Sequence, residues 1–328
     1  MAQTKPLVST SAESVSGWTL SDGLAAVEER LRQLLKSRES LLTEISTYLV
    51  GSGGKRVRPA VTLLIYRACG GVRLDEIVDV ATALELIHSA TLLHDDIIDN
   101  SETRRGQPSA LYRFGLAHTL VTGDFIFCRA FQLCARFEEK LIRWAADACI
   151  ALTEGEVMQS RFRRNPDVTL DDYLEIVSRK TASIFQQGSR AAAHLAGASQ
   201  EIVEATAQAG FAVGMTFQMI DDILDLEGTE QATGKPSGLD LRDGNPSLPI
   251  VMAMERDPWI RSRFAGPLSD QDLPEVRRRI LESGAIERAR ELAGHYADRA
   301  RKFLSRLPPG EEKDILLQLV DQLVHRAA

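Results

Sequence analysis

The chain has 328 residues, which is enough for one large domain or two of ordinary size. Apolar residues make up 44% of it and charged residues 26%, the balance of a globular protein with a substantial core. The net charge of −7 argues against a nucleic acid as the main partner, and no apolar run approaches the ~20 residues of a membrane span.

Residues 1–20 are rich in Ser and Thr and contain no apolar segment. We expect a frayed terminus rather than a signal peptide, with a transit peptide as the open alternative. Residues 21–328 show no sharp domain boundary and are expected to form a single domain. The cysteines lie in apolar helical pattern without C-x-x-C spacing, so we interpret them as reduced core residues of a cytoplasmic protein. They are Cys69, Cys128, Cys134 and Cys149.

Almost all of the chain is predicted to be helical, because apolar residues recur at intervals of three and four and strand-like alternation is absent. A first amphipathic helix is expected from about residue 24 to 49, with Ser21 or Asp22 as its cap. Thr169 and Asp172 resemble a capping box that begins a later helix. Further helices are expected at 74–100, 110–135, 137–163 and 211–226, and the longest loop at 228–249.

A basic segment, Gly53-Gly54-Lys55-Arg56-Val57-Arg58-Pro59, follows the first helix. Its glycines would let the backbone approach a ligand, and a helix N-terminus beside cations is suited to an anion. Taken alone, the segment fits an ordinary basic loop better.

Two acidic segments have the same D-D-x-x-D order within apolar runs. The first contains Asp95, Asp96 and Asp99, and the second contains Asp221, Asp222 and Asp225. On a helix the outer two aspartates of each segment share one face, and the middle one lies about 100° away. One such segment would fit a solvated acidic face. Two facing sets of buried carboxylates repel one another unless cations separate them.

These carboxylates predict a magnesium site for a phosphorylated substrate, in a cleft between two helices. Oxygen ligands favour a hard ion, and Mg²⁺ commonly completes its shell with substrate phosphate. Arg104 and Arg105 either clamp a diphosphate or neutralise the aspartates. His88 lies two turns before Asp95 and could reach the same cleft, whereas we interpret His94 as a core residue.

Two further polar features accompany the acidic segments. Lys180 and Thr181 interrupt an apolar helix face, either as a surface break or as a phosphate contact. Lys235 belongs to the loop 228–249, which is rich in Gly, Pro and Asp and is a plausible lid.

Together these segments closely resemble the trans-isoprenyl diphosphate synthases, the all-α family that extends allylic diphosphates with isopentenyl diphosphate. The resemblance covers about residues 25–250, and its six motifs stand in family order. They are GGKRVRP at 53–59, LIHSATLLHDDIID at 86–99, RRG at 104–106, KT at 180–181, FQMIDDILD at 217–225 and GKPSGLDLRDG at 234–244.

The resemblance implies a helical bundle of the isoprenoid synthase type with a central cavity, a homodimer, and Mg²⁺, with three ions per site. The six aspartates are implied as metal ligands, with Asp96 and Asp225 less directly engaged. Other implied roles follow the matched motifs. Arg104, Lys180 and Lys235 would bind the allylic diphosphate; Lys55, Arg58, His88 and Arg105 the isopentenyl diphosphate; and Thr181 and Gln218 would face the carbocation.

Product length is expected to depend on Ala90 and Thr91, about one helical turn before Asp95. Short-chain members of the family carry aromatic residues there, whereas small residues let the tunnel continue. We therefore expect a long-chain, octaprenyl-like synthase that serves quinone side chains, with the helix around 141–152 as a candidate wall. The alternatives are a short-chain synthase, a class I terpene cyclase and a non-catalytic subunit; the intact second motif and basic segment argue against the last two.

Overall fold

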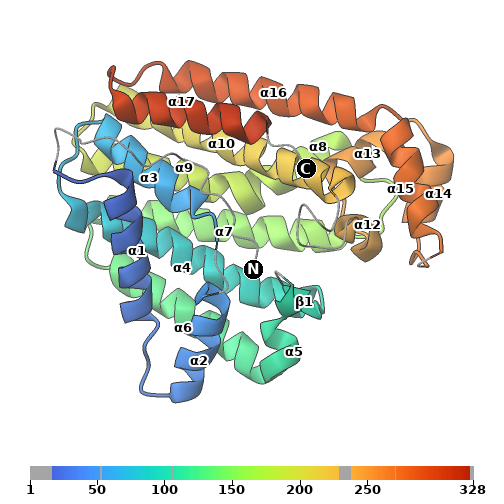
Figure 1. The fold of residues 1–328 in the computed structure, drawn as a ribbon, viewed down its shortest axis with the longest axis horizontal. Coiled ribbons are helices and arrows are strands. Elements are labelled where there is room, and N and C mark those ends of the chain that lie inside the picture. Colours follow the sequence, from blue (N-terminus) through green and yellow to red (C-terminus); the bar gives the residue numbers. More distant parts are fainter. Residues whose placement is uncertain (1–16, 52–53, 105, 229–237, 270, 326–328) are drawn as a thin grey trace. The chain divides into compact units, whose positions relative to one another are not determined.

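The computed structural model describes residues 17–51, 54–104, 106–228, 238–269 and 271–325 (Figure 1). The chain forms two compact units. The first comprises Met1–Asp147, Gln187–Ala207 and Leu304–Leu319, and the second comprises Ala148–Gln186, Gln208–Phe303 and Val320–Ala328. Because the units alternate along the chain, neither is a continuous segment of sequence, and the sequence therefore shows no boundary between them.

The described residues are almost entirely helical, as predicted. Elements of the first unit are α1 (Leu20–Leu34), α2 (Ser40–Gly51), α3 (Val57–Ala68), α4 (Leu74–Ile98), β1 (Thr103–Arg104), β2 (Gln107–Pro108), α5 (Ala110–Phe114) and α6 (Leu116–Cys134). Helices with residues in both units are α7 (Glu139–Phe162), α9 (Ser183–Leu195), α10 (Gln200–Glu227), α16 (Ala285–Leu304) and α17 (Glu311–Val324). The second unit also contains α8 (Leu170–Val177), the π-helical turn η1 (Ser178–Ala182), α12 (Leu239–Asp243), α13 (Leu248–Met254), α14 (Pro258–Phe264) and α15 (Leu273–Glu282).

Helix α4 is the central element of the first unit and packs against α1, α3 and α6. Its side chains are buried almost without interruption from Ile77 to Leu93, so its apolar surface is not confined to one stripe. The helix is long and apolar enough to cross a membrane, but 83% of its most apolar window is buried inside the protein. Such burial is what the core helix of a globular protein shows.

The core of the second unit lies around the C-terminal half of α10. Met219, Ile220 and Ile223 pack there with Tyr173 of α8 and the apolar residues of α13. Because these residues surround the second acidic segment, its aspartates lie on a helix that is largely buried, as the sequence predicted.

Several local expectations were wrong. The first predicted helix is two helices, α1 and α2, and its cap is Thr19, which forms a capping box with Asp22. Trp18 is already buried within the expected frayed segment, and its indole N–H donates to the carbonyl of Val72; residues 1–16 lie outside the described residues. Gly115, at φ 81°, separates α5 from α6. Cys128 is exposed rather than part of the core.

Candidate active-site residues

The first acidic segment occupies the last turn of α4 and the residue that follows it. Asp96 is fully buried, and Arg104 donates to its Oδ1 through Nε at 2.7 Å. Burial raises the pKa of Asp96, and the charge of Arg104 offsets part of this effect. Asp95 and Asp99 are only partly buried. The segment therefore separates into one aspartate inside the protein and two that share an outer face.

Arg104 belongs to a short hairpin in which β1 pairs with β2. Its ion pair with Asp96 ties this hairpin to the end of α4. Arg104 therefore neutralises an aspartate in the structure, which is one of the two roles that the sequence allowed for it. Arg105 lies outside the described residues.

The middle aspartate of the second segment is also the buried one. Asp222 is 4% exposed, and three donors surround its carboxylate. Gln218 Nε2 donates to Oδ1 at 2.8 Å, and the Tyr173 hydroxyl and the Leu248 amide donate to Oδ2 at 2.7 and 3.0 Å. Burial nevertheless raises the pKa of Asp222 to about 6. Its hydrogen bonds join α10 to α8 and to α13.

Asp225 binds the backbone at the start of α12. Its carboxylate accepts hydrogen bonds from the amides of Leu239 and Asp240 at 3.3 and 3.2 Å, and its carbonyl accepts one from Gly238. The half-buried Asp240 lies close enough for the charges of Asp225 and Asp222 to add to the effect of desolvation in raising its pKa. Lys235 and most of the predicted lid lie outside the described residues.

The donor set fits Mg²⁺ bound together with a diphosphate better than an all-protein metal cage. Among the described residues, no three His, Cys, Asp or Glu side chains gather closely enough to hold one ion. Each acidic segment instead presents an i, i+4 pair, Asp95 with Asp99 and Asp221 with Asp225. Mg²⁺ is commonly bound through one or two carboxylates, with water and substrate phosphate as its other ligands.

Lys180 and Thr181 lie within the π-helical turn η1, in the second unit. The ammonium of Lys180 donates to Gln159 Oε1 at 2.6 Å and forms an ion pair with Glu156. The Thr181 hydroxyl donates to Gln218 Oε1 at 2.9 Å. The family resemblance assigned Thr181 and Gln218 the same role, facing the carbocation, and the structure places the two side chains in contact. A hydrogen bond from Gln218 links them to Asp222.

The basic segment leads into α3. Lys55 is exposed and Arg58 is half-buried, whereas Arg56, in left-handed conformation at φ 48°, turns into the protein. Its guanidinium donates to Glu28 Oε1 at 2.5 Å and to the buried Glu85 Oε1 at 2.6 Å. Sequence analysis assigned no role to Arg56, although its place between two predicted anion-binding residues was a signal.

His88 and His94 both lie on α4, and both side chains are half-buried. His94 packs against Gly123, where an added Cβ would lie 2.2 Å from its Nε2, and stacks on Phe127. These contacts support its interpretation as a packed residue.

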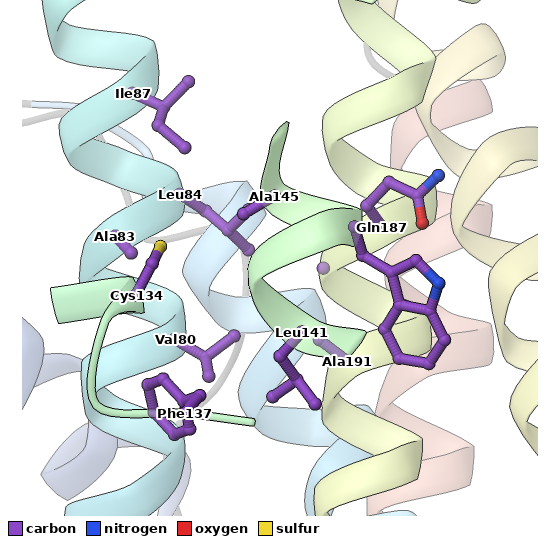
Figure 2. A pocket seen from close by; sticks show the side chains of 12 residues that line it. Val80, Ala83, Leu84, Ile87, Cys134, Phe137, Leu141, Ala145, Gln187 and Ala191 are labelled. Carbon is purple, nitrogen blue, oxygen red and sulfur yellow. The ribbon is translucent and has the colours of Figure 1, made fainter. Parts of the chain in front are cut away.

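An apolar cavity of about 430 Å³, its mouth included, lies beside α4 in the first unit (Figure 2). Ile87 lies at one end of the labelled side chains in Figure 2 and Phe137 at the other. The cavity is lined by Val80, Ala83, Leu84, Ile87, Cys134, Phe137, Leu141, Trp144, Ala145, Gln187, Gly188 and Ala191.

The cavity and the first acidic segment share one side of α4. Positions 80, 84, 87, 91 and 95 follow helical spacing, so Thr91 lies between the cavity wall and Asp95. Ala90 and Thr91 are both buried, at 0% and 8% exposure. At ~1.5 Å per residue, Ile87 lies about 12 Å and Val80 about 22 Å along the helix from Asp95. Sequence analysis placed a wall near residue 141 but missed Phe137 and Gln187.

The chain matches the family model described as polyprenyl synthetase over residues 39–275. Heptaprenyl diphosphate synthase component 2 of Geobacillus stearothermophilus is 38% identical over 92% of this chain and 94% of that protein. Octaprenyl diphosphate synthase of Escherichia coli is 33% identical over 96% of this chain and 98% of that protein. The structure of a Caulobacter crescentus polyprenyl synthase, complexed with calcium and isoprenyl diphosphate, is 34% identical and has a TM-score of 0.89 over 93% of this chain and 95% of that one.

Proposed function

The chain belongs to the polyprenyl synthetase family, and on that premise we propose that it is a prenyltransferase that makes a long-chain all-trans polyprenyl diphosphate. Its substrates are isopentenyl diphosphate and an allylic diphosphate such as geranyl or farnesyl diphosphate. The observation that carries this proposal is the side of α4 that leads from Asp95 past the buried Thr91 to an apolar cavity. The walls of this cavity are almost entirely apolar, which suits a hydrocarbon tail.

The diphosphate end of the allylic substrate is assigned to the acidic segments and the cations near them. We assign metal contact to Asp95, Asp99 and Asp221, with Mg²⁺ as the ion and three ions per site. Asp96, Asp222 and Asp225 belong to the same sets and support them through the contacts described above. Lys180, Arg104 and Lys235 complete the charge around this diphosphate.

Isopentenyl diphosphate is assigned to Lys55, Arg58, His88 and Arg105. The ion pairs of Arg56 with Glu28 and Glu85 hold the backbone between Lys55 and Arg58. A separate cationic pocket would hold the second substrate so that its double bond meets the allylic carbon, which converts a bimolecular reaction into an intramolecular one.

The reaction begins with cleavage of the allylic C–O bond. Bound Mg²⁺ supplies Lewis acidity toward the diphosphate. Lys180 stabilises the charge that develops on the leaving group. Thr181 and Gln218, each fixed by a hydrogen bond, turn their dipoles toward the allylic cation. The double bond of isopentenyl diphosphate attacks C1 of this cation and forms the new C–C bond. The resulting cation then loses a proton to the departing diphosphate, which restores a double bond.

The assembly we propose is a homodimer formed through α6. Five large apolar residues of α5 and α6 are exposed, which is unusual for the surface of a monomer; they are Tyr112, Leu116, Leu120, Val121 and Phe131. A relative named as one component of a synthase makes a heteromer the alternative, and light scattering of the purified chain distinguishes the two. None of the four cysteines, all among the described residues, forms a disulfide. This fits the reducing cytoplasm, where we place the enzyme.

A product ladder tests the proposed function. The purified protein is incubated with farnesyl diphosphate, isopentenyl diphosphate and Mg²⁺, and the products are measured by mass spectrometry. We expect prenyl chains longer than 20 carbons. Products that stop at 15 or 20 carbons would indicate a short-chain synthase, the alternative suggested by a 33% identical geranylgeranyl diphosphate synthase of Methanosarcina mazei. Cyclic hydrocarbons would indicate a terpene cyclase.

A further inference from the structure

The residues that carry Lys180 and Thr181 form the π-helical turn η1 between α8 and α9. A π-helical turn inside a helix is rare and occurs frequently at functional sites. It gives up the regular hydrogen-bond pattern of the helix, so the surrounding structure must hold it in place. The second unit does so from two sides, through α7 and through α10.

Two glycines bring these neighbouring helices into backbone contact with η1. A Cβ added to Gly155 of α7 would lie 2.6 Å from the backbone nitrogen of Lys180 and 3.0 Å from its Cα. A Cβ added to Gly214 of α10 would lie 2.7 Å from Cα of Ala182. The distances of 2.6 and 2.7 Å are shorter than real Cβ contacts, and the atoms opposite belong to the backbone. Only glycine therefore fits at either position without a shift of the turn.

Each glycine lies one helical turn from a side chain that binds η1. Gly155 precedes Gln159, which accepts a hydrogen bond from Lys180, and Gly214 precedes Gln218, which accepts one from Thr181. Positions i and i+4 share one helix face. Close backbone approach and side-chain binding are therefore combined on one face of each helix, and together they fix where Lys180 and Thr181 lie.

We propose that Gly155 and Gly214 are positioning residues for the reaction, which set the place of Lys180 and Thr181 by admitting η1 between α7 and α10. This inference rests on the proposed function, because it takes Lys180 and Thr181 to face the substrate. The glycines themselves do not touch it. Their effect on rate comes through placement, and a displacement of about 1 Å can cost on the order of 100-fold in rate.

The test compares Gly155→Ala and Gly214→Ala with Gly294→Ala. Gly294 lies in α16 of the same unit, and nothing lies within 4 Å of a Cβ added there. Alanine is the better helix former at each position, so local propensity alone would make all three variants neutral or more stable. We expect kcat to fall at least tenfold in the first two, with the KM for isopentenyl diphosphate changed less than twofold. The share of allylic alcohol, formed when water captures the cation, should rise. Gly294→Ala should match the wild type in all three measurements.

If Gly155→Ala and Gly214→Ala fold and have the kcat and the share of allylic alcohol of the wild type, the inference is wrong. The proposed function would not be affected by that result. An inactive wild type would instead refute the proposed function. If both alanine variants fail to fold, Gln159→Ala takes their place in the test. This variant removes a contact of η1 without adding an atom beside the backbone of the turn. A higher alcohol share in Gln159→Ala supports the inference, and wild-type values in that variant contradict it.

Discussion

The depth of the cavity beside α4 can be tested by blocking it at two levels. Ala90 lies five residues before Asp95 and Ala83 lies twelve, so a phenylalanine would stand about 7.5 Å or about 18 Å along the helix from the metal-binding end. The cavity wall reaches Val80, at about 22 Å. Ala90→Phe therefore removes about two-thirds of the available depth, and Ala83→Phe removes about one-fifth.

The products of these variants should form a graded series. Ala90→Phe should give the shortest chains, Ala83→Phe intermediate chains, and the wild type the longest, as measured by mass spectrometry. Ala135→Phe is the matched control, because Ala135 is exposed and is not part of the cavity wall. Overpacking costs about 1–3 kcal/mol, so thermal unfolding should confirm that each variant is folded.

Two outcomes would refute the reasoning. If folded Ala83→Phe has the wild-type product distribution, the growing chain does not enter this cavity. If Ala83→Phe and Ala90→Phe stop at the same length, the order of residues along α4 does not set the depth. Conversely, Phe137→Ala should lengthen the products, since it removes a ring from the end of the cavity away from Ile87.

Three further predictions concern the polar residues. Asp95→Ala should lower kcat/KM at least 1,000-fold with unchanged circular dichroism, and chelation of Mg²⁺ should abolish turnover reversibly; full activity in that variant would remove the metal assignment. Tyr173→Phe should cost about 1–3 kcal/mol of unfolding free energy in urea, because Asp222 loses a buried donor. Tyr66→Phe should cost less, since its hydroxyl makes only longer contacts, accepting from the Arg73 amide at 3.2 Å and lying 3.5 Å from Glu76; equal losses would contradict this. Arg56→Met should lower the free energy of unfolding by about 3–5 kcal/mol, because it leaves Glu85 buried and unpaired. Adding Glu85→Gln to this variant should restore part of that stability. If it restores none, the ion pair does not account for the loss.

Local features of the fold were predictable from the sequence because they depend on neighbouring residues. The capping box of Thr169 and Asp172 begins α8 as expected. The course of α4 follows from its continuous apolar pattern, and the i, i+4 arrangement of Asp95 and Asp99 follows from helix geometry. The family resemblance extended this to a function, and the match to the polyprenyl synthetase family confirms it.

Features that depend on contacts between distant residues were not predictable. The ion pair of Asp96 is one of them, because a two-stranded hairpin brings Arg104 to this aspartate. The sequence K-T shows two polar residues, but it shows neither the π-helical turn that carries them nor the close approach of Gly155 to that turn. Product length was not predictable for the same reason: small residues at 90 and 91 predict a tunnel without a block there, but the far end of the cavity is lined by residues outside α4, such as Phe137 and Leu141.

The most direct test of the account is a crystal structure with Mn²⁺ in place of Mg²⁺ and a non-hydrolysable thio analogue of farnesyl diphosphate. We expect anomalous peaks about 2.1 Å from carboxylate oxygens of Asp95 and Asp221, with the diphosphate beside them and the tail directed past Thr91 toward Ala83. Metal bound away from these aspartates, or a tail that leaves the cavity empty, would contradict it.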